Sequence, residues 1–264
     1  MLPQRLRVSF VGAGGQRIAA RLDAPAAHTV AYALFAHCFT CGKDLKAANW
    51  ISRELVDRRI AVLRFDFTGL GESEGDFAET NFSTNVQDLV AAAAFLREQY
   101  AAPRILIGHS LGGTAVLAAA PLIPESVAVA TIAAPSQTQH LRDLLAGQAP
   151  EVLAGGEAVV DVMGHRVRIK RQMLDDLVRH NPAELAANLG RALLVFHSPT
   201  DEVVPIEDAE RLFAAADHPK SFVALDGADH LLITRETDAR YVAAVLATWA
   251  QRYLPTEDGQ RGNG

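Results

Sequence analysis

Short apolar runs alternate along this chain with longer segments in which apolar residues recur every three or four positions. The runs at 30–36, 60–65 and 127–133 have the continuous form expected of strands buried on both faces, and the runs at 105–107, 192–197 and 221–225 are also predicted as strands. The intervening periodicity predicts helices at 45–57, 83–99, 206–216 and 238–253, and Ser83 is the expected N-cap of the second. Buried strands that alternate with helices indicate right-handed crossovers. We therefore expect an α/β fold with a mostly parallel sheet and helices on both faces.

Two other segments depart from this alternation. Residues 5–11 and 18–22 alternate apolar and polar positions around a glycine-rich turn, which predicts a β-hairpin at the start of the sheet. The segment 136–187 combines a polar helix-like piece, an alternating run centred on Gly164 and a further helical stretch. We interpret it as a small cap inserted into one domain that spans 1–254. The polar, glycine-rich residues 255–264 predict a disordered tail or a linker remnant.

The sequence Gly108-His-Ser-Leu-Gly112 stands between a predicted strand and an Ala/Leu-rich helix. This G-x-S-x-G pattern is typical of the nucleophile elbow, a strand-to-helix turn that exposes one serine hydroxyl. Side chains at 108 or 112 would collide with the neighbouring chain in such a turn. The following helix would direct unpaired N–H groups and its positive dipole end toward Ser110. The alternative is a purely structural turn, but the strand before it and the helix after it favour a nucleophile.

A serine nucleophile needs a base within reach and a third group that orients the base. In this architecture the partners follow in the order serine, acid, histidine, each in a loop after a strand. Asp201 follows the strand at 192–197, and His230 follows the strand at 221–225. Both loops belong to the carboxyl edge of the sheet, where ligands of open α/β sheets bind. We therefore predict a triad of Ser110, Asp201 and His230.

Other residues compete for some of these roles. Three more acidic residues lie in the same two loops, with Asp226 second to Asp201 and then Glu202 and Asp229. No other histidine follows the last strand, so His37 and His109 are expected to pack around the site rather than to act as the base. The tetrahedral intermediate also needs two N–H donors, and the backbone N–H of Leu111, directly after the nucleophile, is the first.

Four stretches in the right order resemble the α/β-hydrolase family, over about residues 5–254. They are Arg64-Phe-Asp-Phe-Thr-Gly-Leu-Gly-Glu-Ser73, Gly108-His-Ser-Leu-Gly-Gly113, His197-Ser-Pro-Thr-Asp201 and Gly227-Ala-Asp-His230. The resemblance implies the α/β-hydrolase fold and a serine esterase that cleaves small carboxylic (acyl) esters through an acyl-enzyme, without a metal or organic cofactor. It also points to the N–H of Phe39 as the second oxyanion donor. Arg64 and Asp66 are expected to pair or to cap the glycine-rich loop.

The same chemistry leaves several activities open. Thioesterases, amidases, peptidases and perhydrolases use the same catalytic groups, and a non-catalytic scaffold is the alternative of another class. The wording of Ala36-His-Cys-Phe-Thr-Cys-Gly-Lys43 is similar to a narrower bacterial group. In that group the hydrolase domain is often fused to an OsmC-type peroxide-reducing domain, so the resemblance implies a functional link to such a domain.

Cys38 and Cys41 are the only cysteines, and their C-x-x-C spacing places them beside Phe39. Two thiols lack the further ligands that a closed zinc site needs. Three interpretations remain: small packing residues in a tight loop, a redox switch that deforms the oxyanion loop, and a thioredoxin-like role in a redox accessory module.

The composition excludes some classes of binding partner. The chain has 264 residues, 49% of them hydrophobic, and a net charge of −6, which provides no basic surface for nucleic acid or anionic membranes. No apolar run is long enough to span a bilayer, and the N-terminus lacks the apolar core of a signal peptide, so we expect a cytoplasmic protein. The expected partner is a small-molecule ester. The sequence leaves the oligomeric state open, a homodimer included.

Overall fold

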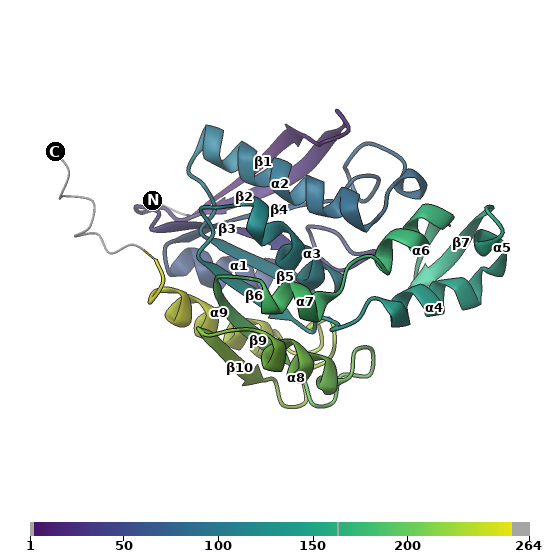
Figure 1. Cartoon of the computed structure of the whole chain (residues 1–264). Coiled ribbons are helices and arrows are strands. Elements are labelled where there is room, and N and C mark those ends of the chain that lie inside the picture. The colour runs from purple at the N-terminus through teal and green to yellow at the C-terminus, as the bar shows by residue number, and fades with distance from the viewer. Residues whose placement is uncertain (1–2, 163, 255–264) are drawn as a thin grey trace.

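The computed structural model describes residues 3–162 and 164–254, so the tail expected at 255–264 lies outside the described residues. Within them, one sheet of eight strands has the order β1-β2-β4-β3-β5-β6-β9-β10 (Figure 1). The strands are β1 (Gln4–Val11), β2 (Arg17–Ala24), β3 (Ala31–Ala36), β4 (Ile60–Phe65), β5 (Ile105–His109), β6 (Ala128–Ile132), β9 (Ala192–His197) and β10 (Lys220–Ala224). β2 pairs antiparallel with β1 and β4, and all other neighbours are parallel. The predicted α/β-hydrolase fold with a mostly parallel sheet is confirmed.

Helices cover both faces of this sheet, as the continuous apolar strands predicted. α1 (Lys46–Asp57) and α9 (Glu236–Ala250) pack on one face, and α2 (Phe82–Gln99), α3 (Leu111–Ala119) and α8 (Ile206–Ala215) pack on the other. Alternate residues of β3 enter the two cores: Ala33 and Phe35 the first, Leu34 and Ala36 the second. Because both faces of β3 are buried, its sequence lacks the alternating polar residues of a strand with one exposed face.

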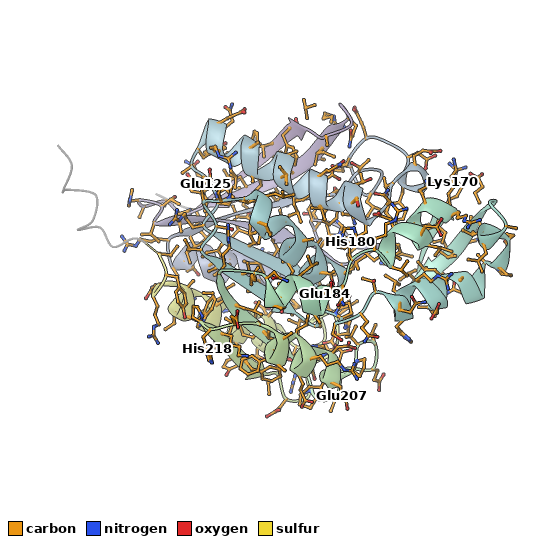
Figure 2. All side chains as sticks on the ribbon, in the orientation of Figure 1. Glu125, Lys170, His180, Glu184, Glu207 and His218 are labelled. Atoms are coloured by element: carbon orange, nitrogen blue, oxygen red, sulfur yellow. A yellow bond between two sulfur atoms is a disulfide. The ribbon has the colours of Figure 1, made fainter. Side chains whose placement is uncertain are left out.

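The segment 136–187, which we call the cap, lies outside the main sheet (Figure 1). It contains α4 (Gln139–Gln148), α5 (Pro150–Leu153), α6 (Arg171–Leu177), α7 (Pro182–Ala187) and an antiparallel hairpin of β7 (Glu157–Val162) and β8 (His165–Lys170). The side-chain amide of Gln148 bonds both the N–H and the carbonyl of Asp161, each at 2.9 Å, which ties α4 to β7. Arg168 and Lys170 of β8 form ion pairs with Asp76 and Glu79 of the main domain. Figure 2 labels Lys170 on the cap.

The start of α2 differs from the sequence prediction. Asn81, not Ser83, is the N-cap: its Oδ1 accepts from the N–H of Thr84 at 2.8 Å, and Thr84 Oγ1 accepts from the N–H of Asn81 at 3.3 Å. Ser83 lies in the first turn and donates from its hydroxyl to Asp176 of α6 at 3.1 Å. The prediction of Ser83 was wrong because this serine serves a long-range contact rather than a local capping bond.

Asp88 of α2 gives the protein a pH-dependent element of stability. It is fully buried, and burial raises its pKa to about 6 although its carboxylate accepts hydrogen bonds from Thr68. A carboxyl whose pKa is higher in the folded state contributes its full stability below the pKa of the unfolded state. This contribution is lost as the pH rises through the pKa of the folded state, and the loss is about 3 kcal/mol by pH 7.5. We expect the free energy of unfolding in urea of Asp88→Asn, minus that of wild type, to be more favourable to the variant at pH 7.5 than at pH 4.5. An equal effect at both pH values would contradict this.

Candidate active site

Ser110 stands on a strained turn between β5 and α3. Its backbone has φ 54° and ψ −125°, a conformation that non-glycine residues rarely adopt and that recurs at functional sites. A Cβ on Gly108 would overlap the backbone carbonyl of Gly112, and a Cβ on Gly112 would overlap the backbone carbonyls of Ala36 and His37. The two glycines of the motif are therefore required by the close approach of β5, α3 and β3 at this point.

The three residues predicted as a triad lie within hydrogen-bond distance of one another. His230 Nε2 is 3.1 Å from Ser110 Oγ, and His230 Nδ1 is 2.8 Å from Asp201 Oδ2. An ionised carboxylate only accepts hydrogen bonds, so Nδ1 carries the proton and Nε2 is free to accept the serine proton. The side chains of His230 and Asp201 are almost fully buried, which shields their interaction from water. This arrangement can activate the serine as a nucleophile.

Backbone amides hold the carboxylate of Asp201 in place. Its Oδ1 accepts from the N–H groups of Val203 at 2.8 Å and Val204 at 3.0 Å. Burial alone would raise the pKa of Asp201, but the hydrogen bond and charge of His230 together with these amides lower it below its usual value. Asp201 therefore stays ionised beside His230.

The rival acids lie elsewhere. Asp229 accepts from the N–H groups of Ile233 and Thr234 and so closes its own loop, while Glu202 and Asp226 are exposed. None of these three carboxylates has a hydrogen bond to His230 in the part of the chain that the structure describes.

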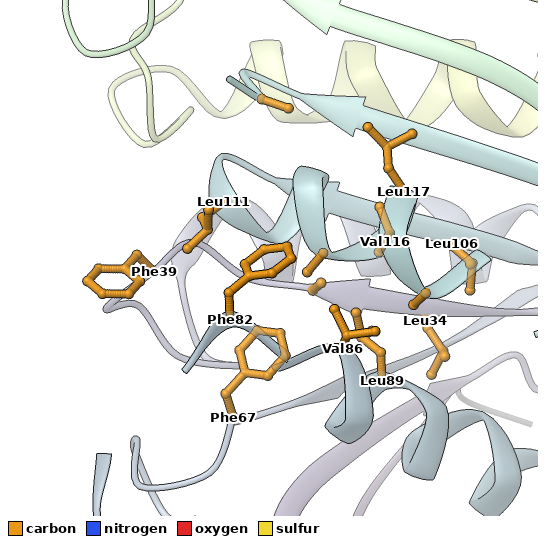
Figure 3. Packing of buried hydrophobic residues seen from close by; sticks show 14 of the residues in the cluster. Leu34, Phe39, Phe67, Phe82, Val86, Leu89, Leu106, Leu111, Val116 and Leu117 are labelled. Carbon is orange, nitrogen blue, oxygen red and sulfur yellow. The ribbon is translucent and has the colours of Figure 1, made fainter. Parts of the chain in front are cut away.

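Phe39 and Leu111 border the same cavity as Ser110 (Figure 3 shows them at one end of the buried cluster). Leu111 opens α3, where N–H groups have no acceptor within the helix. The N–H of Phe39 donates to no other described residue. Neither amide is therefore used by another hydrogen bond among the described residues, and their role as donors in an oxyanion hole stays a prediction.

Cys38 and Cys41 form a disulfide across the turn that holds Phe39. The N–H of Cys41 also donates to the carbonyl of Cys38 at 3.2 Å. Thr40, between them, donates from its hydroxyl to the carbonyl of Val162 in the cap at 3.3 Å. The loop 37–43 is thus closed by a disulfide and hydrogen-bonded to the cap. Among the described residues, no cluster of histidine, cysteine and carboxylate side chains could hold a metal ion.

Arg64 and Asp66 do not pair with each other as expected. Arg64 is fully buried and pairs with Asp23 at 2.6 Å across β4 and β2, whereas Asp66 accepts from Lys43 Nζ at 2.8 Å and from the N–H of Glu72 at 3.0 Å. Asp23 of β2 lies opposite Val62, two residues before Arg64, so Asp23 and Arg64 share one face of the sheet, while Asp66 lies beyond the end of β4. Asp66 does hold the glycine-rich loop, and through Lys43 it also connects this loop to the loop 37–43.

A cavity of about 470 Å³ lies over Ser110, between the sheet edge and the cap. Most of its wall is apolar: Phe39, Leu111, Pro135, Leu141, Leu144, Val162, Val203, Val204 and Pro205. The sequence did not indicate the three cap residues of this wall, because only the tertiary fold brings the cap over the elbow. A larger hollow of about 960 Å³ is lined by residues that precede β3 and β5, at the opposite edge of the sheet from Ser110. We assign the candidate site to the smaller cavity, because Ser110, Phe39 and Leu111 line it.

Comparison with known proteins agrees with this geometry. Residues 33–245 match the Alpha/beta hydrolase family, which is most of the chain. The chain belongs to the alpha/beta hydrolase family. The crystal structure of an esterase domain from Rhodothermus marinus is 52% identical in sequence, with a TM-score of 0.79, over 96% of this chain and 100% of that domain. Together these findings support a hydrolase.

More distant matches occur among solved structures and among protein sequences. Est1E from Butyrivibrio proteoclasticus, solved with ferulic acid, is 17% identical with a TM-score of 0.75 over 92% of this chain and 98% of its own. The uncharacterized protein YfhR of Salmonella typhi is 25% identical over 70% of this chain, and the match spans 60% of the length of YfhR. In the ranges that the structure describes, no helix combines the length and the apolar composition needed to cross a bilayer.

Proposed function

We propose that this protein is a serine esterase that cleaves small carboxylic esters through an acyl-enzyme. The observation that carries the proposal is the continuous hydrogen-bonded chain from Ser110 through His230 to Asp201 on a strained elbow under an apolar cavity. The 52% identity to an esterase domain over nearly the whole chain supports ester rather than amide bonds. A palmitoyl-protein thioesterase from rat is 39% identical over only 25% of this chain, so thioester cleavage is the alternative.

Each group has one role in the proposed reaction. Ser110 Oγ attacks the acyl carbon while its proton passes to His230 Nε2, and Asp201 stabilises the imidazolium that forms. The N–H groups of Leu111 and Phe39 donate to the oxyanion of the tetrahedral intermediate. Collapse of this intermediate expels the alcohol, which takes the proton from His230. Water then attacks the acyl-enzyme by the same route and releases the acid.

The cavity sets the expected substrate size. Its volume of about 470 Å³ lies in the lower part of the range for small-molecule sites, and its apolar wall suits a hydrocarbon or aromatic acyl group. Leu141, Leu144 and Val162 of the cap close it on the side away from the sheet. We infer that acyl chains too long for this space are poor substrates.

The test is hydrolysis of p-nitrophenyl esters from acetate to laurate, with rapid-mixing detection of nitrophenol and peptide mass analysis of quenched, digested enzyme. We expect a chain-length optimum below laurate, a burst of about one nitrophenol per enzyme, and a mass increase equal to one acyl group on the peptide that contains Ser110. Acyl-CoA thioesters with the same chains serve as the comparison. A clear preference for the thioesters would overturn the assignment to esters, and turnover without a covalent intermediate would overturn the mechanism.

Other sequence-based expectations stay predictions. The redox hypothesis for Cys38 and Cys41 predicts that the same assay changes when dithiothreitol reduces the disulfide to two thiols. A homodimer, a link to an OsmC-type domain and a cytoplasmic location rest on the sequence alone.

A further inference from the structure

Two buried histidines end the strands that lead into the catalytic loops. His109 is the last residue of β5 and precedes Ser110, and His197 is the last residue of β9, whose following loop holds Asp201. β6 lies between these two strands in the sheet. Both imidazoles are buried, and neither takes part in the proton transfers described above. The hydrogen bonds of the two rings indicate their function.

His109 binds the backbone of the base itself. Its Nε2 lies 2.7 Å from the carbonyl oxygen of His230, which is 121 residues away in the sequence. A carbonyl oxygen only accepts hydrogen bonds, so Nε2 must carry the proton. His109 Nδ1 is buried and has no hydrogen-bond partner among the described residues, which fits a neutral ring without a proton on that atom. Burial, reinforced by the neighbouring His230, lowers the pKa of His109 to about 3.

His197 makes the equivalent contact with the acid loop. Its Nε2 lies 2.8 Å from the carbonyl oxygen of Val204, and its Nδ1 is also buried without a partner in the described part of the chain. The N–H of the same Val204 donates to Asp201 Oδ1 at 3.0 Å. His197 Nε2 is 3.7 Å from Asp201 Oδ2, too far for a direct hydrogen bond. His197 therefore acts on Asp201 through the peptide group that holds its carboxylate.

We propose that His109 and His197 are positioning residues, each of which fixes the backbone of one catalytic loop through a single hydrogen bond from a neutral imidazole. The inference rests on the proposed function. A planar ring at the end of a sheet strand is a rigid donor. Its hydrogen bond therefore fixes the position of the loop backbone, which has no regular structure of its own, relative to the sheet. A displacement of about 1 Å in such a group costs about 100-fold in rate.

The test separates positioning from packing by paired substitutions. His109→Met and His197→Met keep an apolar side chain of similar length but remove the donor, whereas His109→Gln and His197→Gln retain an N–H group. We expect each methionine variant to lose about 10- to 100-fold in kcat with KM changed less than twofold, because the substrate pocket is intact. The glutamine variants should recover most of this loss. Rates are normalised to the fraction of folded enzyme from circular dichroism, because slower acylation would itself reduce the burst amplitude.

His180→Met is the matched control, because the Nε2 of His180 bonds Ser83 of α2 at 3.2 Å, away from the triad. Unchanged kcat in the methionine variants at positions 109 and 197, or equal losses in the methionine and glutamine variants, would overturn the inference. Ser110→Ala in the same assay tests the proposed function separately: an active Ser110→Ala would refute that function, whatever the histidine variants do.

A measurement on the wild-type protein covers the case in which a variant does not fold. Nitrogen NMR of histidine-labelled protein at pH 8 distinguishes the two neutral tautomers. We expect the Nε2–H form for both His109 and His197. The Nδ1–H form at either position would overturn the inference for that residue.

Discussion

Ser110→Ala is expected to lower kcat by about 10⁶, the loss typical of removing the nucleophile of a triad. The hydroxyl that forms the acyl-enzyme is gone, and no other nucleophile stands 3.1 Å from His230 Nε2 among the described residues. Folding should be unaffected, because alanine meets the same backbone strain at φ 54° as serine does. The check is steady-state hydrolysis of a short p-nitrophenyl ester together with the melting temperature.

His230→Ala and the double variant sharpen this experiment. Residues that act as one unit lose their contributions together, so the double variant should be no slower than Ser110→Ala alone. A residual rate of about 10³-fold or more over water is expected in all three, because the oxyanion donors and the pocket remain. Independent, multiplicative losses would mean that Ser110 and His230 do not act on the same proton.

The elbow could be predicted from sequence because its geometry leaves few choices of residue. Gly108 and Gly112 have no room for a Cβ, so the motif itself records how closely β5, α3 and β3 approach. The strands were equally clear, since burial on both faces gives continuous apolar runs such as 60–65. Both features are local, and a local constraint restricts which residue types can stand at neighbouring positions of the sequence.

Contacts between distant residues left no such trace. The bond from His109 to the carbonyl of His230 could not be read from either motif, because a backbone carbonyl accepts from any donor. The pairing of Arg64 with Asp23 was missed for a similar reason: Asp66 is near Arg64 in the sequence, and only the placement of β2 beside β4 brings Asp23 within reach. The cap wall of the cavity likewise depends on how α4 and β7 fold back over the elbow.

Asp201→Asn is expected to lower kcat by about 10⁴ while the fold is retained, as in other triads in which the acid becomes an amide. The asparagine Oδ1 can still accept from the amides of Val203 and Val204, which turns its NH₂ group toward His230 Nδ1. Nδ1 must then accept a hydrogen bond, so the imidazole proton moves to Nε2. In that tautomer His230 cannot accept the proton of Ser110, and the serine is no longer activated.

Three matched variants decide whether Asp201 is the acid. Asp226→Asn, Asp229→Asn and Glu202→Gln make the same chemical change in the same two loops, and none of these side chains bonds His230 in the described structure. We expect the kcat of Asp226→Asn and Glu202→Gln for the p-nitrophenyl ester to stay within about threefold of wild type, because these exposed side chains lie away from such contacts. Asp229→Asn should lose more than these two but less than Asp201→Asn, because Asp229 accepts two backbone N–H groups of the loop beside His230. A large loss in Asp226→Asn combined with an active Asp201→Asn would transfer the role to Asp226. It would also show that the loop after β10 moves during turnover, since the exposed Asp226 would have to reach a buried imidazole.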